Sequence, residues 1–412
     1  LNIVGSSRYA KSIILDSIAK KEDKNILLIC PNTEIAYKWI GYFESINDRA
    51  VLYYPPTEHL PYASINKSKE IEFSQLTVLS KLIKEEKKEP NIVISTERSL
   101  QPHLINKNLL IENKLDLQKG KQIEIQELAN KLTLLGYTKE NVTSTEGFWS
   151  RRGEIIDIYP VNNEFPIRLE FFDNVIEKIR EYDPHTQKTL ESINNIEIIQ
   201  AGFDLLIKDK LNNLSKNSIF NSEDINKNNL DRYLGIIEKE PSNIIDFINK
   251  ETILVIDELG DCKKFANNWF LDSKSNFDNC EYELNENLKN NDINLEVIPN
   301  LHLKFDKILN SLGNFNLIKM YEFESKDNIH NRFLLNDKRL NSYSKNIGKL
   351  SNDINKNIKN KEKVWILSAQ PLRTRTLLFE HECNTNFLNN PNDIDEAFKS
   401  INNSTPLIIK NK

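Results

Sequence analysis

Short β-branched apolar runs alternate with helical segments over about the first 110 residues, and this alternation constrains the fold more than any other feature. Charged residues, Pro or Asn flank each run, as is typical of buried parallel strands. The helical segment 34–43 places Ile35, Trp39 and Phe43 on one face. We therefore predict a doubly wound α/β sheet of the nucleotide-binding kind. The predicted strands are residues 1–4, 26–30, 51–54 and 92–94.

The pattern changes near Gly120, where a predicted helix at 125–135 leads into short strands separated by turn signals. Such a segment is typical of an inserted α+β module. The α/β pattern resumes at 252–258, and a further strand and helix are predicted at 364–368 and 373–380. A chain of 412 residues predicts about three domains. The expected order is a first α/β part, the inserted module, a second α/β part and a small terminal α/β domain. Their expected bounds are 1–115, 116–200, 201–322 and 323–412.

A phosphate-binding loop is the first candidate site. Gly5, Lys11 and Ser12 match the pattern GxxxxGK[ST], except that Ala10 stands where the pattern has its second Gly. The loop binds phosphate through converging backbone N–H groups, while the Lys neutralises phosphate charge and the Ser or Thr holds Mg²⁺. A Cβ atom at position 10 would impede that close approach. The motif is therefore broken.

Asp257 and Glu258 form the second part of the same candidate site, because they end a predicted apolar strand. A nucleotide enzyme places its Mg²⁺ ligand and its water-orienting acid at such a position. The alternative is an Asp that caps the next helix. We interpret the two motifs together as a nucleotide-binding fold that has lost its site. A functional ATPase that uses Lys11, Ser12, Asp257 and Glu258 is the alternative.

The predicted strand 167–172 carries the third candidate site. Its alternation turns Ile167, Leu169 and Phe171 to one face and leaves Arg168 and Phe172 together on the other. A tight Asp173-Asn174 turn then leads into a predicted strand at 175–182. An exposed aromatic residue beside arginines is typical of a protein-binding hot spot. In the alternative interpretation, Phe172 covers the turn and the arginines balance nearby glutamates.

Arg151 and Arg152, on a neighbouring Gly-bounded turn, extend this arginine-rich surface. The surface is not a nucleic-acid coat, because residues 147–185 carry five Lys and Arg against eight Asp and Glu. The net charge of the whole chain is -5. The four cysteines show no disulfide or zinc spacing, and no apolar run is long enough to span a membrane. A cytoplasmic location is expected. The chain begins with Leu1 and ends in an apolar run, which is the pattern of a fragment.

Three segments of the inserted module resemble the UvrA-binding module shared by the excision-repair protein UvrB and the bacterial transcription-repair coupling factor (Mfd). They are GEIIDIYP at 153–160, PIRLEFF at 166–172 and IREYDPHTQKTLE at 179–191. YPPTEHLPY at 54–62 and STERSLQ at 95–101 are similar to the first domain of the coupling factor. UvrB has an intact phosphate loop and a Tyr-rich hairpin, whereas here Ala10 breaks the loop and Tyr53 and Tyr54 pass through Pro55 and Pro56 directly into a helix. The departures favour the amino-terminal, UvrB-like region of the coupling factor.

The resemblance implies a degenerate RecA/helicase-like domain split by a UvrA-binding insert. It also implies that Arg152, Arg168 and Phe172 contact UvrA. We therefore expect Arg168→Ala or Phe172→Ala each to cost about 1–3 kcal/mol of UvrA affinity with little loss of fold. In that family, RNA polymerase and DNA are bound by downstream domains. The motor that uses ATP and Mg²⁺ lies downstream too, and a carboxy-terminal domain masks the UvrA-binding surface. The expected role is a repair-recruiting arm with no enzymatic activity or cofactor of its own; an ATP-dependent UvrB/helicase-like repair enzyme is the alternative.

Overall fold

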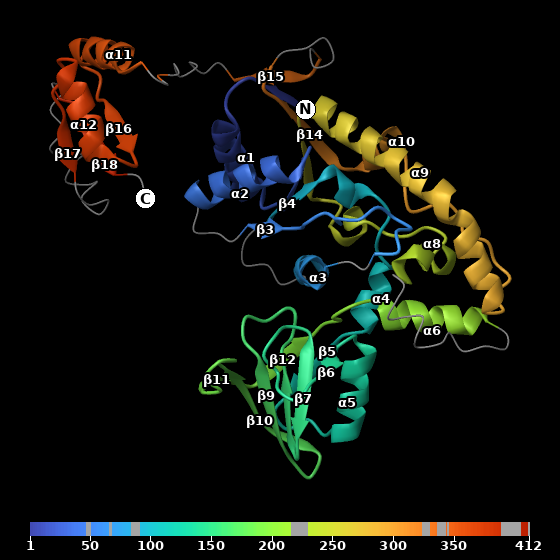
Figure 1. Ribbon diagram of the computed structural model, residues 1–412. Coiled ribbons are helices and arrows are strands. Elements are labelled where there is room, and N and C mark those ends of the chain that lie inside the picture. The colour runs from blue at the N-terminus through green and yellow to red at the C-terminus, as the bar shows by residue number, and fades with distance from the viewer. Residues whose placement is uncertain are drawn as a thin grey trace. The chain divides into compact units, whose positions relative to one another are not determined.

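The computed structural model divides into two compact units, Leu1–Asp337 and Lys338–Lys412 (Figure 1). It describes residues 1–46, 51–65, 68–83, 91–215, 230–323, 330–335, 343, 346–388 and 405–410. None of the helices in these described ranges is long and apolar enough to cross a membrane.

A parallel sheet forms the centre of the first unit. Its strands are ordered β15-β1-β14-β13-β2-β4-β3, and every neighbouring pair is parallel. The mixed α/β class with a parallel sheet is confirmed. The strands are β1 (Asn2–Val4), β2 (Ile26–Cys30), β3 (Leu52–Tyr53), β4 (Ile92–Thr96), β13 (Ile253–Asp257), β14 (Asn316–Tyr321) and β15 (Arg332–Leu334).

Helices cover both faces of this sheet because its central strands are apolar on both sides. In β2, Ile26 and Leu28 pack into one cluster of buried residues, whereas Leu27 and Ile29 pack into another. The first cluster includes buried residues of α1 and α2, and the second includes residues of α3, α9 and α10. Figure 1 shows α1 and α2 side by side on one flank and α9 on the opposite flank. The helices are α1 (Arg8–Glu22), α2 (Thr33–Ile46), α3 (Lys69–Ile83), α9 (Leu259–Asn290) and α10 (Phe305–Ser311), with the 3₁₀ turn η4 (Leu312–Asn314) after α10.

The chain leaves the parallel sheet after β4 and returns to it with β13. Between them lies a second sheet ordered β11-β10-β9-β8-β7-β6, and β5 pairs with β12. The predicted bounds of the strands 167–172 and 175–182 are confirmed. The elements are η1 (Glu97–Leu100), α4 (Lys107–Glu112), β5 (Leu115–Gln118), α5 (Ile125–Leu134), β6 (Thr138–Lys139), β7 (Phe148–Arg152), β8 (Ile155–Ile158), β9 (Ile167–Phe172), β10 (Val175–Tyr182), β11 (Thr189–Ile193) and β12 (Asn195–Ile198).

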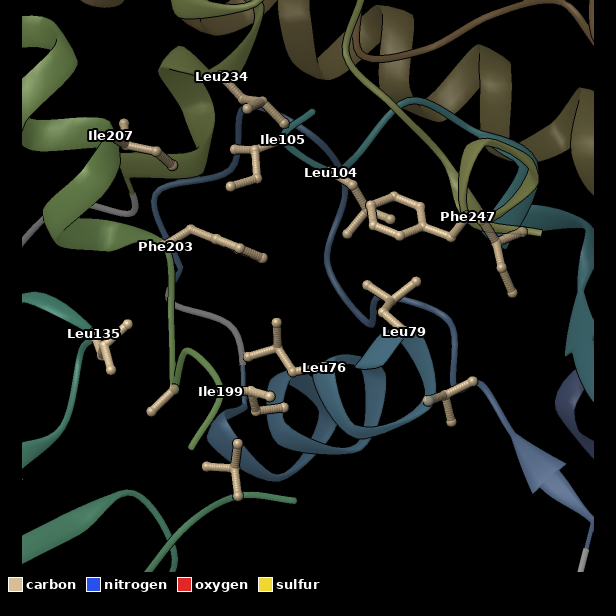
Figure 2. Packing of buried hydrophobic residues seen from close by; sticks show 14 of the residues in the cluster. Leu76, Leu79, Leu104, Ile105, Leu135, Ile199, Phe203, Ile207, Leu234 and Phe247 are labelled. Atoms are coloured by element: carbon tan, nitrogen blue, oxygen red, sulfur yellow. The ribbon is translucent and has the colours of Figure 1, made fainter. Parts of the chain in front are cut away.

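Helix α3 joins the second sheet to the first. Figure 2 shows Leu76 of α3 beside Ile199, which follows β12, and Leu79 toward Leu104 and Phe247. The Thr77 hydroxyl donates a hydrogen bond of 2.7 Å to the carbonyl of Val161. The two sheets therefore share one hydrophobic core. Further elements that contribute to the first unit before β13 are α6 (Asp204–Leu214), η2 (Leu230–Tyr233), α8 (Leu234–Ile237) and η3 (Ile244–Phe247).

Two expectations about the chain's organisation need correction. We expected the terminal domain to begin at residue 323, but β15 pairs with β1 and the first unit extends to Asp337. We also expected Tyr54 to lead directly into a helix, but α3 begins only at Lys69, and residues 54–65 form a loop. Prolines at 55, 56 and 61 oppose a helix over residues 54–60, since a residue before Pro is disfavoured in the helical conformation.

The terminal unit, considered by itself, is a small parallel α/β fold. Its strands are ordered β16-β18-β17, and both pairs are parallel. Ile354, Leu378, Cys383 and Ile408 form its buried centre. Its elements are α11 (Ile347–Lys359), β16 (Trp365–Ser368), α12 (Pro371–Glu380), β17 (Asn386–Leu388) and β18 (Leu407–Lys410).

Candidate functional site

The predicted alternation along β9 is confirmed by the burial of its side chains. Ile167, Leu169 and Phe171 are buried in the core, whereas Phe172 is 70% exposed. Phe172 ends β9 and pairs with Val175 across the Asp173-Asn174 turn. Both turn residues have positive φ, at 49° and 62°, as a tight two-residue hairpin requires.

A second turn lies beside Phe172. Strand β9 runs antiparallel to β8, and the Phe171 N–H donates to the carbonyl of Glu154 in the β7–β8 turn. That turn follows Arg151 and Arg152, and Gly153 has a φ of 61°. We call the exposed residues Arg151, Arg152 and Phe172 the hairpin-tip surface. The strand register places Arg152, through Ile155 and Glu170, on the outward face, whereas Arg151 pairs with Ile156 and lies on the other face of the sheet. A shared surface of these arginines with Phe172 stays a prediction.

Arg168 lies on the same face of the sheet, but its guanidinium is bound to a carboxylate of this chain. Its Nε donates to Asp157 Oδ1 at 2.8 Å, and its Nη2 donates to Asp157 Oδ2 at 2.9 Å. Nη2 also donates to Gln187 at 3.0 Å, and the guanidinium lies 4.5 Å from the centroid of the Tyr182 ring. The hydrogen bond with Asp157 is the main reason that the pKa of Arg168 is raised.

Asp157 links the two predicted arginines. It is only 3% exposed and, besides Arg168, it accepts a hydrogen bond of 3.0 Å from Arg152 Nη2. The side chain of Arg152 is 58% exposed, whereas that of Arg168 is 17% exposed. Asp157 was missed in the sequence analysis. The sequence feature that could have revealed Asp157 is that it is the single carboxylate within the apolar run of β8. The structure places it directly opposite Arg168 in the strand register.

The other predicted site lies where β1 and β13 end. Gly5 has a φ of 90°, and a Cβ atom there would lie 2.7 Å from the Leu335 carbonyl oxygen. Ser7 caps α1, which already begins at Arg8. The Lys11 N–H bonds to the Ser7 carbonyl, so it belongs to the helix and not to a phosphate loop. Lys11 is buried, and this burial lowers its pKa.

Groups of the protein already bind one oxygen of each carboxylate of this site, while the buried Asp257 Oδ1 has no hydrogen-bond partner among the described residues. Asp257 is fully buried, and its Oδ2 accepts hydrogen bonds from Arg8 Nε at 2.7 Å and Trp39 Nε1 at 2.9 Å. Glu258 has a φ of 51°, and its Oε1 accepts a hydrogen bond from the Glu322 N–H. Burial raises the pKa of Glu258.

These residues do not fit a Mg²⁺–nucleotide. A guanidinium occupies one side of the carboxylate that would hold the metal, and the N–H groups of Ala10 and Lys11 are bonded to Ser7. The Ser12 hydroxyl, which would bind Mg²⁺, donates to the Tyr9 carbonyl at 2.6 Å. Within the described ranges, no three His, Cys, Asp or Glu side chains gather as a metal site.

Two parts of the chain match known families. Residues 115–202 match the UvrB interaction domain, which covers the six-stranded sheet and the hairpin-tip surface. The chain is similar to the amino-terminal region of transcription-repair coupling factors. Residues 339–412 match the Rossmann-like domain of cyanobacterial Mfd, in agreement with the parallel α/β fold of the terminal unit.

Individual relatives support the same similarity. The transcription-repair-coupling factor of Bacillus subtilis is 28% identical over 286 residues, which cover 62% of this chain and 24% of that protein. The Staphylococcus epidermidis protein is 28% identical over 291 residues, with 64% and 24% covered. The Haemophilus influenzae protein is 27% identical over 194 residues, with 47% and 16% covered. The matched part of the chain thus spans about a quarter or less of these relatives.

Proposed function

We propose that this chain is the repair-recruiting arm of a transcription-repair coupling factor and that it binds UvrA at RNA polymerase stalled on damaged DNA. The observation that carries the proposal is the match of residues 115–202 to the UvrB interaction domain. That match falls on a sheet with an exposed Phe172 at the end of β9 and a largely exposed Arg152 at the end of β7.

The hairpin-tip surface has the composition of a protein-binding hot spot. A large aromatic side chain that is mostly exposed in the free chain can bury much apolar area in a complex. Arg152 lies next to it with most of its side chain in solvent, so it can bind a partner carboxylate with its remaining N–H groups. We propose that Phe172 and Arg152 contact UvrA directly.

Arg168 has a different role in this proposal. Its Nε and Nη2 are bound to Asp157, so it is less available to a partner than Arg152. The resulting pair holds β8 and β9 in register and fixes the carboxylate that Arg152 also contacts. We propose that Arg168 acts mainly as a positioning residue for Arg152, with a direct contact to UvrA limited to its remaining N–H groups.

We further propose that the α/β part of the first unit is a degenerate RecA/helicase-like domain, split by the UvrA-binding insert. Its support is the parallel sheet and the Arg8–Asp257 ion pair where a metal would bind. This chain would then need no ATP or Mg²⁺. The contacts with RNA polymerase and DNA, the ATP-dependent motor and the carboxy-terminal masking domain would belong to other parts of the whole protein. Within the described ranges, the hydrogen bonds of Ser12, Asp257 and Glu258 are to the protein's own groups and do not favour the alternative of an ATP-dependent UvrB-like enzyme.

Immobilised UvrA tests the proposal through capture of this chain from solution. We expect capture at physiological salt, and this chain should need no bound nucleotide to be captured. Absence of capture, with the chain shown to be folded by its thermal transition, would contradict the proposed function. A captured chain that no longer binds after hairpin-tip substitutions would assign the contact to that surface.

A further inference from the structure

The terminal unit carries a net charge opposite to that of the rest of the chain. Residues 338–412 contain 13 Lys and Arg against 7 Asp and Glu, a net charge of +6, whereas residues 1–337 contain 42 against 53, a net charge of -11. The net charge of -5 for the whole chain therefore conceals a basic unit. Such a difference between two parts of a chain is typical of a basic part that binds an anionic partner.

Helix α11 of the terminal unit has one apolar face and one basic face. Its apolar side chains belong to the core of this unit; they are Ile347, Leu350, Ile354 and Ile358. Lysines at positions i, i+7 and i+10 lie on the opposite face, and all three are exposed. We call Lys349, Lys356 and Lys359 the lysine row.

No group in the described part of the chain neutralises the lysine row. None of its three ammonium groups forms an ion pair or a hydrogen bond with a described residue. Asp353, the only acidic residue of α11, flanks the row. It accepts a hydrogen bond of 2.9 Å from the Tyr343 hydroxyl and pairs with none of the three lysines. The positive charge of the row is therefore available to a partner.

The stability of the helix accounts for only part of the lysine row. Lys356 and Lys359 lie in the last turn of α11, where cations are favourable because they face the negative end of the helix dipole. Lys349 lies in the first turn, at the positive end, and this turn contains no acidic residue. A cation at that position weakens an isolated helix. A bound anion would offset this unfavourable placement.

The geometry of the row suits a rigid, densely charged anion. The three lysines span about 15 Å along the helix axis, at about 1.5 Å per residue. Duplex DNA carries about one negative charge per 1.7 Å of its axis, so several phosphates can face such a row. Asn352 and Asn360 are exposed next to the lysines and can donate to phosphate oxygens. Helix α11 has no aromatic side chain on which the bases of a single strand could stack.

We propose that the lysine row of α11 binds the phosphate backbone of duplex DNA without reading its sequence. This contact goes beyond the proposed function, because it adds a DNA contact within this chain to those that belong to other parts of the whole protein. An acidic protein surface is the alternative partner for the same charges.

Fluorescence anisotropy of a short labelled DNA duplex tests the proposal with the full chain over a range of salt concentrations. The triple variant Lys349→Gln, Lys356→Gln, Lys359→Gln should bind at least tenfold more weakly at low salt. Each lost phosphate contact should reduce the slope of log K against log salt by about 0.9, so the triple variant should lose about 2.7. Lys349→Gln alone should lose about 0.9. This single variant tests the row even if the triple variant does not fold, since Lys349 does not support the helix.

The matched control is the triple variant Lys21→Gln, Lys119→Gln, Lys250→Gln. It replaces three exposed lysines of the first unit and removes the same total charge, so it should bind DNA as wild type does. The lysine-row variant should bind UvrA as tightly as wild type, and the hairpin-tip variant should keep its DNA affinity. Failure of this proposal is thus distinguishable from failure of the proposed function.

Four results would overturn the proposal. They are the absence of saturable DNA binding at low salt, equal weakening by the two triple variants, tighter binding of a single strand than of a duplex of the same length, and stronger competition by polyglutamate than by unlabelled duplex. The last result would assign the lysine row to an acidic protein surface.

Discussion

Arg168 and Asp157 form a two-point ion pair across β8 and β9, with Nε–Oδ1 and Nη2–Oδ2 distances of 2.8 and 2.9 Å. The pair lies on the outward face of the sheet, and Arg152 reaches the same carboxylate from β7. Three neighbouring strands are thus linked through one buried carboxylate. The arginine most firmly tied to this carboxylate is part of the fold as well as of the proposed surface.

Replacing Arg168 should therefore destabilise the fold, contrary to our expectation from the sequence. Arg168→Ala leaves the buried Asp157 with only the exposed Arg152 as a cationic partner. Loss of one member of a fully buried pair costs about 3–5 kcal/mol. Because Arg168 is slightly exposed, we expect about 2–3 kcal/mol in the free energy of unfolding, measured by denaturant titration. Arg152→Ala should cost under about 1 kcal/mol; equal effects of the two substitutions would contradict the assigned roles.

The chain should not bind Mg-ATP. A ligand at 100 times its dissociation constant would stabilise the fold by about 2.7 kcal/mol, which a thermal melt detects easily. We expect no shift of the melting temperature with millimolar Mg-ATP.

Restoring the missing glycine should not create a nucleotide site. From the sequence, Ala10 is the residue that breaks the phosphate loop. In the structure, the Ala10 N–H bonds to the Ser7 hydroxyl and position 10 lies inside α1, so Ala10→Gly frees no N–H group. We expect Ala10→Gly to melt at the same temperature with and without Mg-ATP. A nucleotide-dependent stabilisation of this variant would show that the Cβ atom alone had closed the site.

Glu97 should make the fold less stable as pH rises through the weakly acidic range. Burial raises its pKa from 4.5 to about 7. Between these values the unfolded chain releases the proton while the folded chain keeps it, so stability is highest below pH 4.5 and falls up to about pH 7. At 1.36 kcal/mol per pKa unit, the loss is about 3 kcal/mol.

Glu97→Gln should remove this part of the pH dependence. Denaturant titrations at pH 5 and pH 8 measure the difference in unfolding free energy, and the exposed Glu140→Gln serves as the control. We expect a smaller pH dependence for Glu97→Gln alone. An unchanged pH dependence would mean that the Glu97 carboxyl ionises inside the fold at its ordinary pKa.

The sequence pattern correctly predicted those strands whose position is determined by their own residues and by the adjacent turn. The bounds of β9 and β10 followed from period-two alternation and from two residues, Asp173 and Asn174, that tolerate positive φ. The all-buried β2 and β13 followed from uninterrupted apolar runs. Each of these signals is carried by the segment itself, so no knowledge of distant partners was needed.

Relationships between distant segments could not be predicted in the same way. The role of Asp157 depends on its register opposite Arg168, and β15 is a short exposed strand that is recognisable only through its pairing with β1. The Arg8–Asp257 ion pair joins residues 249 positions apart. The sequence identified Lys11 and Asp257 as parts of one predicted site, but it did not identify the Arg8 guanidinium that binds Asp257.

The central claim is that the hairpin-tip surface binds UvrA. The most direct test compares the dissociation constant for UvrA between the wild-type chain and the double variant Phe172→Ala, Arg152→Ala. The control is Phe379→Ala on the terminal unit, because Phe379 and Phe172 are both 70% exposed. Hot-spot truncations of about 1–3 kcal/mol each predict at least a tenfold weaker complex for the folded double variant and no change for the control. A folded double variant that binds UvrA as tightly as wild type would contradict the account.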